Sequence, residues 1–423
     1  MALVVGAIAF VNGVAALALL ASVADSPRRK LFEVNAYLGT ALVTISLGAM
    51  LVYQAASSLG NVGSSAMRFP RSWVIFVVPL AVAFPVLVFF GQQQVNNPER
   101  LPWLFPFTYL AIVSIPSMLA ALGAAYGYTR NNPFAWPVSI REWTSGFIYG
   151  AVGATGIASI INTLYLVIGA AWLIHAKGSG DAFELTRNLP SVPTGWGIAF
   201  DLSVLSVVAP LNEEFWKGMI VGFFFFRKGG AARCFMWGVL AGAGFNLLET
   251  FQNSLSVVSP EAVSDRTIGS QWWLFASARA GTGAVHALAT GLSALGFYGL
   301  FRRQPRFLIG YPLGVLTHGT WNFLNFTLAG DAFFSRAGPD TTLLDILSVI
   351  GLCAEFVVCV VMLWVLPQRL RDGLPAPLYR VLGMLPRGAE SDGPGDARGR
   401  AAEPIGPASL AGWEEPSVSQ MSR

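Results

Sequence analysis

The chain has 423 residues, of which 54% are hydrophobic and only 12% are charged. A soluble domain carries about 25% charged residues, and the apolar residues here come in long runs, so the composition excludes an ordinary soluble protein and predicts a polytopic membrane protein. The net charge of +4 fits arginines in cytoplasmic loops and gives no sign of a nucleic-acid-binding surface.

Ten segments of the sequence are predicted to be membrane-spanning helices. A helix needs about 20 apolar residues to cross a bilayer, and most of these segments reach that length. The expected fold is therefore all-α, a polytopic bundle of about ten transmembrane helices. The segments are residues 2–23, 32–56, 73–91, 102–128, 143–175, 194–226, 233–252, 272–301, 306–329 and 341–366.

The fifth and sixth segments are longer than a bilayer requires, so we expect them to tilt, kink or extend beyond it. Pro210 gives the sixth segment a reason to kink, because proline removes a backbone hydrogen bond. Three pairs of glycines have the GxxxG spacing that is typical of contacts between membrane helices. These pairs are Gly146/Gly150, Gly238/Gly242 and Gly310/Gly314.

The orientation follows from the lysines and arginines of the short loops. The arginines after residue 366 place the C-terminus in the cytoplasm, and alternation from there puts four further basic loops on the same side. The basic loop at residues 28–30 falls outside and is the exception. Residues 387–423 are rich in Gly, Pro, Ala and Ser and are predicted to be a disordered cytoplasmic tail.

Four consecutive spans carry polar and ionisable residues in otherwise apolar sequence. A charged side chain near the bilayer centre costs a few kcal/mol, so such residues usually face the protein interior and mark function. The residues are Glu213, Glu214, Lys217, Asn246, Glu249, Arg279, His286, His318, Asn322 and Asn325.

Four of these residues are expected at a similar depth in the membrane. At about 1.5 Å per residue, Glu213 lies roughly 20 Å from the inner end of its span. By the same rule His286 lies about 21 Å from the outer end of its span and His318 about 18 Å from the inner end. Because Glu249 is nearer the outer end, all four side chains are expected to meet in the middle or outer half of the membrane.

The spacing within the sixth span is also informative. Glu213 and Lys217 are four residues apart on one helix face, in the order that favours an ion pair. Adjacent Glu213 and Glu214 point about 100° apart. We therefore expect one glutamate to do chemistry and the other to hold Lys217, a histidine or a water molecule.

Four short motifs lie in order on successive spans. They are EEFWK at 213–217, FNLLE at 245–249, HALAT at 286–290 and HGTWN at 318–322. As EExxK, FxxxE, Hxxx(G/T) and HxxxN, they resemble the PrsW family of intramembrane proteases, which is related to the CAAX prenyl endopeptidases and the bacterial CPBP proteins. The resemblance covers residues 194–329.

The resemblance implies a peptidase of a bacterial-type cell membrane, in which a buried glutamate activates water to cleave membrane-anchored proteins such as anti-sigma factors. It implies a catalytic core at 194–329, preceded by helices of unknown role over 1–175 and followed by a final helix at 341–366. Carried over by motif, the catalytic candidates are Glu213, Glu214, Glu249, His286, His318 and Asn322, supported by Lys217 and Phe245.

The residues allow this chemistry without the family. A carboxylate in a low-dielectric site holds a proton more tightly, which suits a general base near neutral pH. We expect Glu213 or Glu214 to be that base and Glu249 to orient the water or a histidine. Histidine and asparagine N–H groups can stabilise an oxyanion, so we expect His286 with His318 or Asn322 around it.

A zinc ion is the open alternative to catalysis without a cofactor. His286, His318 and Glu213 make a His₂Glu set of the kind that catalytic zinc sites use. The sequence contains no HExxH, so these ligands would come from separate helices. We prefer the version without a metal at this point.

Two functions of other classes compete with the enzyme. Intramembrane Glu and His residues also form proton relays in transporters, and a membrane scaffold with an inactive site is a third interpretation. The polar residues are concentrated in the C-terminal half with no matching set before residue 194, which favours the enzyme. The expected partners are the lipid bilayer and a membrane-anchored protein substrate, with no nucleic acid. Arg279 is interpreted as a structural counter-ion or an interface anchor and not as a catalytic residue.

Overall fold

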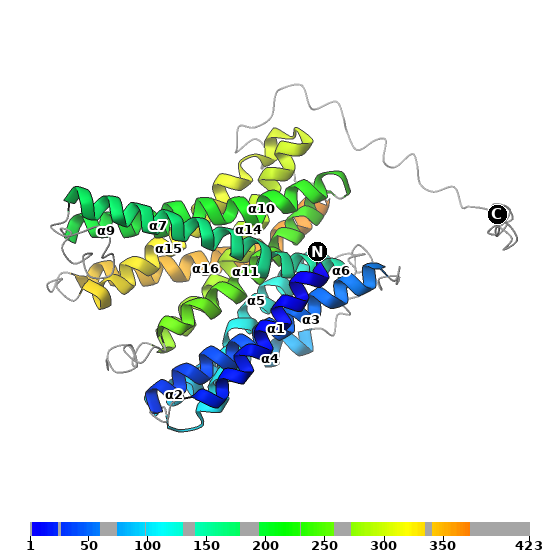
Figure 1. The fold of residues 1–423 in the computed structure, drawn as a ribbon. Coiled ribbons are helices and arrows are strands. Elements are labelled where there is room, and N and C mark those ends of the chain that lie inside the picture. The colour runs from blue at the N-terminus through cyan, green and yellow to red at the C-terminus, as the bar shows by residue number, and fades with distance from the viewer. Residues whose placement is uncertain are drawn as a thin grey trace, which may run out of the picture. The chain divides into compact units, whose positions relative to one another are not determined.

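The computed structural model describes residues 2–23, 27–59, 74–97, 99–129, 140–177, 194–228, 230–257, 272–334 and 341–372. Within these ranges the chain is helical apart from short turns, and each of the ten predicted spans is a helix (Figure 1). The all-α prediction is therefore confirmed for this part of the chain. The tail predicted at 387–423 lies outside the described residues.

The N-terminal half contributes seven α-helices. Two of its spans are interrupted by π-helical segments, η2 (Asn35–Gly39) between α2 and α3 and η5 (Tyr149–Ala154) between α6 and α7. The helices are α1 (Ala2–Leu19), α2 (Pro27–Val34), α3 (Thr40–Leu59), α4 (Val74–Asn96), α5 (Phe105–Thr129), α6 (Ile140–Ile148) and α7 (Thr155–Lys177).

The C-terminal half contributes six more α-helices within the described residues. They are α9 (Thr194–Ser203), α10 (Ala209–Lys228), α11 (Ala231–Val257), α14 (Trp272–Arg302), α15 (Gly310–Phe334) and α16 (Thr341–Asp372). Helices α9 and α10 are joined by the π-helical segment η7 (Val204–Val208). The irregularity expected near Pro210 is thus a widened turn directly before it. Proline has no N–H to donate to the preceding turn, so that turn loses an α-helical hydrogen bond.

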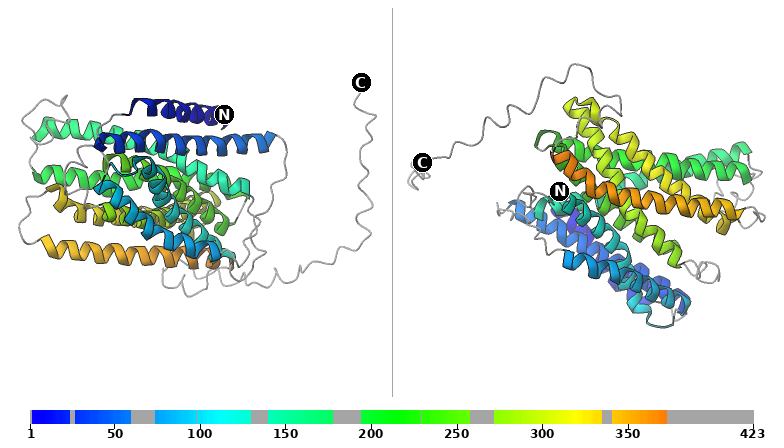
Figure 2. Two further views of the ribbon diagram at one scale, coloured as in Figure 1. Left: turned by 90° about the horizontal axis from the view of Figure 1, so that it is seen from below. Right: turned by 180° about the vertical axis from the view of Figure 1, so that it is seen from behind.

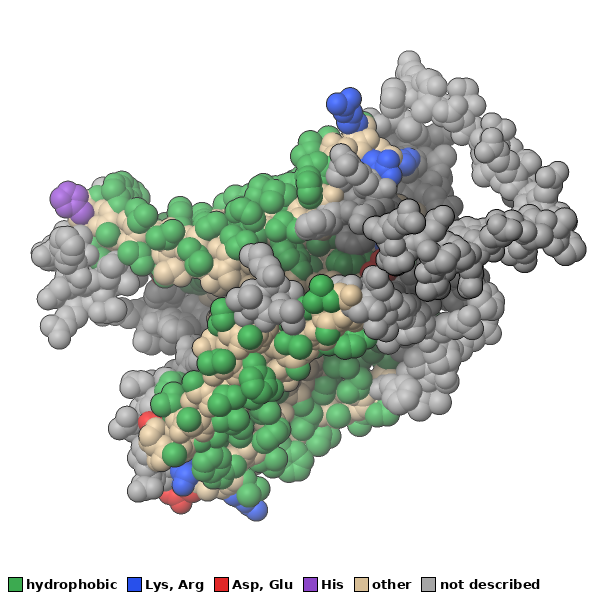
Figure 3. All heavy atoms as spheres, turned by 45° about the vertical axis from the view of Figure 1, so that its right-hand side comes forward, with side chains coloured by type: hydrophobic (Ala, Val, Ile, Leu, Met, Phe, Trp, Pro, Cys, Tyr) green, Lys and Arg blue, Asp and Glu red, His purple; other side chains and the backbone are tan. Residues whose placement is uncertain are grey.

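Among the described residues, seven helices are long and apolar enough to cross a membrane. Helix α1 contains a shorter apolar stretch, and α10 and α15, which carry many of the intramembrane polar residues, are not among the seven. Hydrophobic side chains cover much of the described surface in Figure 3. Exposed apolar side chains are numerous on α4, α7 and α16, as expected for lipid contact.

Helices α11 and α14 form the centre of the bundle. In their most apolar stretches 72% and 83% of residues are buried, against 17% in α16. Figure 2 shows α1 alongside α3 on one side of the bundle and α16 on the other. The polar motifs of α11 and α14 therefore lie inside the protein.

Glycines set the distance between α14 and its three neighbours. Gly238 and Gly242 of α11 face the backbone of α14: a Cβ on Gly238 would lie 2.6 Å from the carbonyl oxygen of Thr290, and one on Gly242 would overlap that of His286. On α15, Gly310 and Gly314 face the carbonyls of Leu292 and Ala289.

Gly218 and Gly222 of α10 form another pair that faces α14, where they pack against Ser293 and Phe297. This pair was not predicted from the sequence. The predicted pair Gly146/Gly150 packs against Leu240 and Ala241 of α11. The three predicted glycine pairs are therefore helix contacts. Small residues let membrane helices approach closely, and here they bring the polar motifs within hydrogen-bonding reach.

We expect Gly242→Ala to destabilise the protein. The added methyl group overlaps a backbone carbonyl, which cannot rotate away as a flexible side chain can. Overpacking of this kind costs about 1–3 kcal/mol. Thermal unfolding of the purified chain in detergent, followed by tryptophan fluorescence, measures the change.

Gly123→Ala is the matched control, because outside its own helical turn no atom of the described residues lies within 4 Å of the added methyl group. Alanine is favoured over glycine in a helix by about 0.5–1 kcal/mol, so this variant should unfold at the same temperature as the wild type or a higher one. Equal unfolding temperatures for the two variants would contradict the close approach of α11 and α14.

Candidate functional site

Four helices bring the predicted motif residues together. Helix α10 supplies Glu213, Glu214 and Lys217, α11 supplies Phe245 and Glu249, α14 supplies His286, and α15 supplies His318. Glu214, Lys217 and His286 are fully buried, and Glu213 and His318 nearly so. Buried charges are tolerated only when they are paired and hydrogen-bonded, so the contacts between them show how the cluster is stabilised.

Lys217 lies at the centre of the cluster. Its ammonium forms an ion pair with Glu214, lies 3.6 Å from Oε2 of Glu213 and lies 3.0 Å from Nδ1 of His286. It also sits 4.0 Å above the ring centroid of Phe245, within the range of a cation–π interaction. The expected partner Glu213 is thus the more distant of the two carboxylates, and Phe245 has a supporting contact.

Glu214 is fully occupied by its neighbours. Besides Lys217, its Oε1 lies 3.0 Å from Nδ1 of His318, and its Oε2 accepts a 3.0 Å hydrogen bond from the hydroxyl of Thr290. One of the two adjacent glutamates was expected to hold Lys217 or a histidine. Glu214 holds both.

Glu213 has one occupied and one open carboxylate oxygen. Its Oε1 accepts a 3.0 Å hydrogen bond from the amide of Asn162 on α7. Its Oε2 is buried and accepts no hydrogen bond within the described residues, and it lies 3.8 Å from Nε2 of His318. A buried carboxylate oxygen without a donor is a costly feature in a stable protein. Chemistry at this oxygen, or a bound cation, would explain it.

Each histidine has a carboxylate on one ring nitrogen. Nε2 of His286 lies 3.0 Å from Glu249, and Nδ1 of His318 lies 3.0 Å from Glu214. The two rings are 4.5 Å apart, centroid to centroid, in an edge-to-face arrangement. A carboxylate that fixes the tautomer and orientation of a histidine is the usual support of a metal ligand.

Glu249 and Arg279 form a less buried edge of the cluster. The guanidinium of Arg279 lies 2.5 Å from Glu249, which confirms its interpretation as a counter-ion. The side chain of Glu249 is 24% exposed, whereas that of Glu214 is fully enclosed. Nε of Arg279 donates to Thr250, whose hydroxyl donates to Asn246. The polar network therefore continues along α11.

Asn322 has a different partner from the one expected. Its amide donates a 2.9 Å hydrogen bond to the carbonyl of Leu205 in η7, and no hydrogen bond within the described residues joins it to the glutamates or histidines. A π-helical turn leaves carbonyl groups without their α-helical donors, and Asn322 satisfies one of them. The structure therefore gives Asn322 a contact that supports the backbone before α10.

Asn162, which contacts the cluster, and Asn212, which contacts Asn162, were missed in the sequence. Asn162 of α7 donates to Glu213, and Asn212 of α10 donates to the side chain of Asn162. The signal was available, because an amide inside an apolar span is unusual. It was overlooked because α7 lies outside the four motifs.

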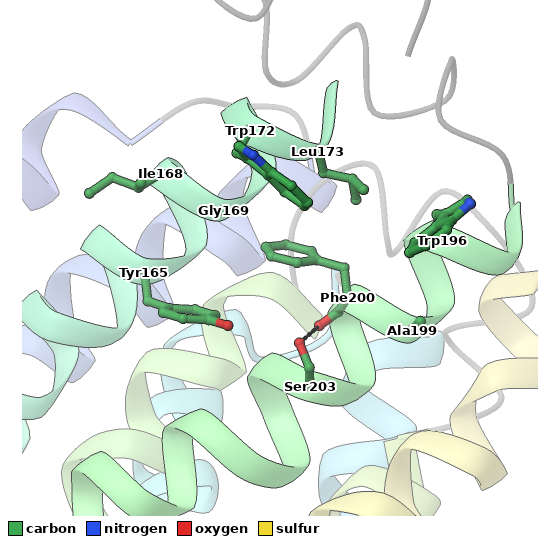
Figure 4. A pocket seen from close by; sticks show the side chains of 9 residues that line it. All are labelled: Tyr165, Ile168, Gly169, Trp172, Leu173, Trp196, Ala199, Phe200 and Ser203. Atoms are coloured by element: carbon green, nitrogen blue, oxygen red, sulfur yellow. Dashed lines mark hydrogen bonds between the residues drawn. The ribbon is translucent and has the colours of Figure 1, made fainter. Parts of the chain in front are cut away.

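A hollow of about 520 Å³ between α7 and α9 contains none of the predicted site residues (Figure 4). Its lining is mainly aromatic and aliphatic, including Tyr165, Trp172, Trp196 and Phe200. This lining offers no titratable group suited to hydrolysis. The cluster of glutamates and histidines is therefore the candidate active site.

The donor set of the cluster fits a metal ion. Glu213, His286 and His318 each offer one ligand atom, and the three atoms lie within 4.8 Å of one another. Tetrahedral zinc holds ligands at about 2.0–2.2 Å, which separates them by roughly 3.5 Å, so the set needs to contract by about 1.3 Å at most. These are the residues that the sequence reading named for zinc. The open Oε2 of Glu213 is the strongest sign in favour.

Residues 184–365 match the PrsW family, described as intramembrane metalloproteases. No curated protein and no solved structure matches the chain. The match is longer than the resemblance recognised over 194–329 and includes most of α16, whereas α1 to α7 lie before it. Residues 184–365 therefore form a domain of the PrsW family of intramembrane metalloproteases, a family of peptidases.

Proposed function

We propose that this protein is an intramembrane endopeptidase that hydrolyses peptide bonds in membrane-anchored proteins, with Glu213, His286 and His318 holding a zinc ion. The observation that carries the proposal is the buried, open oxygen of Glu213 beside two carboxylate-supported histidines. The family's description as metalloproteases favours zinc over the version without a metal that the sequence alone suggested.

Bound zinc would polarise the scissile carbonyl and make a bound water more acidic. The remaining residues have separate tasks. Glu214 and Glu249 each hold one histidine by one ring nitrogen, which would leave the other ring nitrogen of each histidine to bind zinc. Thr290 holds Glu214 in turn. Lys217 supplies positive charge for the oxyanion that forms at the carbonyl.

The position of Lys217 supports the version without a metal as the second candidate. Its ammonium lies 3.0 Å from Nδ1 of His286, so that nitrogen becomes available to an ion only if the lysine withdraws. Without zinc, Oε2 of Glu213 would take a proton from water and return it to the leaving amine. Both versions depend on the same oxygen of Glu213.

The proposal places the C-terminus in the cytoplasm, on the evidence of the arginines after residue 366. It includes α10 and α15 among the spans, which gives ten in total with α1. A charged cluster as deep as this one is tolerated in a lipid-facing protein only when helices enclose it. The peptidase family and the meeting of the motif glutamates, histidines and Lys217 at one place favour the enzyme over a transporter or a scaffold.

We expect Glu213→Gln and Glu214→Gln each to reduce cleavage by on the order of 10²–10⁴-fold. The first removes the charge of the open oxygen, and the second removes the support of His318 and Lys217. Comparison of new protein termini in native membranes measures cleavage and also identifies the substrate. The strains compared carry the wild type, each variant or a deletion.

Glu355→Gln on α16 is the control, because Glu355 is another carboxylate of a spanning helix and, within the described residues, makes no hydrogen bond or ion pair with the cluster. This variant should cut the substrate as the wild type does. The peptidase proposal fails if the termini in the wild type, the two glutamine variants and the deletion strain are the same.

We expect thorough chelation to abolish cleavage by the purified chain and added zinc to restore it. His286→Ala and His318→Ala should each lower the zinc content of the purified protein from about one ion per chain towards zero, because each removes one of three protein ligands. Elemental analysis measures this content without an activity assay. Full cleavage after chelation would exclude the zinc version and leave Glu213 as a base.

A further inference from the structure

Helix α7 lies before the family domain and yet contacts the candidate active site. Four hydrogen bonds join its span to α10: the hydroxyl of Tyr149 donates to the carbonyl of Trp216, Asn162 donates to Glu213, and Asn212 donates both to the carbonyl of Ala158 and to the side chain of Asn162. The residues that α7 contacts flank or include the EExxK motif. The N-terminal half therefore touches the chemistry directly.

The two asparagines form a short relay with a defined direction. The amide nitrogen of Asn212 donates a 2.8 Å hydrogen bond to the side-chain oxygen of Asn162 and a 3.0 Å hydrogen bond to the carbonyl of Ala158. Because the oxygen of Asn162 is occupied in this way, its amide nitrogen is turned towards Oε1 of Glu213, 3.0 Å away. A backbone carbonyl of α7 thus anchors one end of the relay.

The hydrogen bonds of the two asparagines determine which carboxylate oxygen of Glu213 is left without a hydrogen bond. A glutamate side chain has several rotatable bonds, and its carboxylate group can turn freely about the last of them. The bond from Asn162 holds Oε1 on the side of α7, which leaves Oε2 facing His318 and Lys217 at 3.8 and 3.6 Å. No other hydrogen bond to the carboxylate of Glu213 is present within the described residues.

We propose that Asn162 is a positioning residue of the active site: through its amide, helix α7 orients Glu213 for zinc binding and hydrolysis. The inference rests on the proposed function. It also gives part of the N-terminal half a task, since the catalytic domain would be incomplete without a side chain from outside the matched residues. Asn212 acts one step further away by orienting Asn162.

Three variants of the full-length chain test this role. Asn162→Leu has a similar volume and no donor. Asn162→Gln keeps the amide. Thr163→Ala is the matched control, because it removes a polar group from the next residue of α7, which is exposed. The readouts are zinc affinity, by competition with a chromophoric chelator, and kcat and KM for the membrane substrate identified by the comparison of termini.

Loss of a group that orients a metal ligand typically costs 10- to 100-fold in metal affinity or activity. We therefore expect Asn162→Leu to lower zinc affinity and kcat by about 10- to 100-fold, with KM unchanged. Asn162→Gln should recover part of both losses, and Thr163→Ala should match the wild type. A merely structural role would lower the unfolding temperature and leave the zinc affinity of the folded fraction unchanged.

The inference is overturned if Asn162→Leu binds zinc and cleaves within twofold of the wild type, or if Asn162→Gln is no better than Asn162→Leu. In either case the proposed function is unaffected, because the wild-type chain in the same experiment still cleaves the substrate. If the wild-type chain cleaves the substrate but binds no zinc, the kcat values of the Asn162 variants decide whether Asn162 positions Glu213. A wild type that neither binds zinc nor cleaves overturns the proposed function and the inference with it.

Discussion

The glycine contacts around α14 determine what the polar residues can do. A charge inside a membrane is tolerated when an opposite charge or a hydrogen-bond partner lies close to it, and this requires helices to pack at short distances. Gly218, Gly238 and Gly314 each face α14 from a different helix. Larger residues there would separate the helices and leave Glu214, Lys217 and the histidines too far apart to satisfy one another.

Within that packing the two adjacent glutamates differ only in their neighbours. Glu214 points towards α14 and α15, where Thr290, His318 and Lys217 occupy it. Glu213 points towards α7, where one amide holds one oxygen and the other oxygen stays open. A difference of about 100° around the helix thus separates a carboxylate with both oxygens occupied from one with an open oxygen.

Much of this arrangement could be predicted from the sequence. The helical structure of the ten predicted spans follows from apolar runs, and the meeting of Glu213, Glu249, His286 and His318 follows from their similar expected depth, because the rise of a helix is constant. The partner of each side chain could not be predicted in the same way. The choice of Lys217 between Glu213 and Glu214 depends on rotamers, and the contact of Asn322 with Leu205 depends on a π-helical turn. Asn162 was missed because spacing along the chain does not show that α7 packs against α10.

The π-helical segment η7 has a consequence for how the candidate site tolerates a change in chain length. A π-helical turn contains about one more residue than an α-helical turn, so residues on its two sides are offset by about 100° from a regular helix. Removing one residue from Val204–Val208 would let α9 and α10 join as one regular helix. Glu213 would then turn away from His318, or α9 would turn away from α7. Length is therefore constrained more tightly in this segment than amino-acid identity, although none of its five side chains takes part in the cluster.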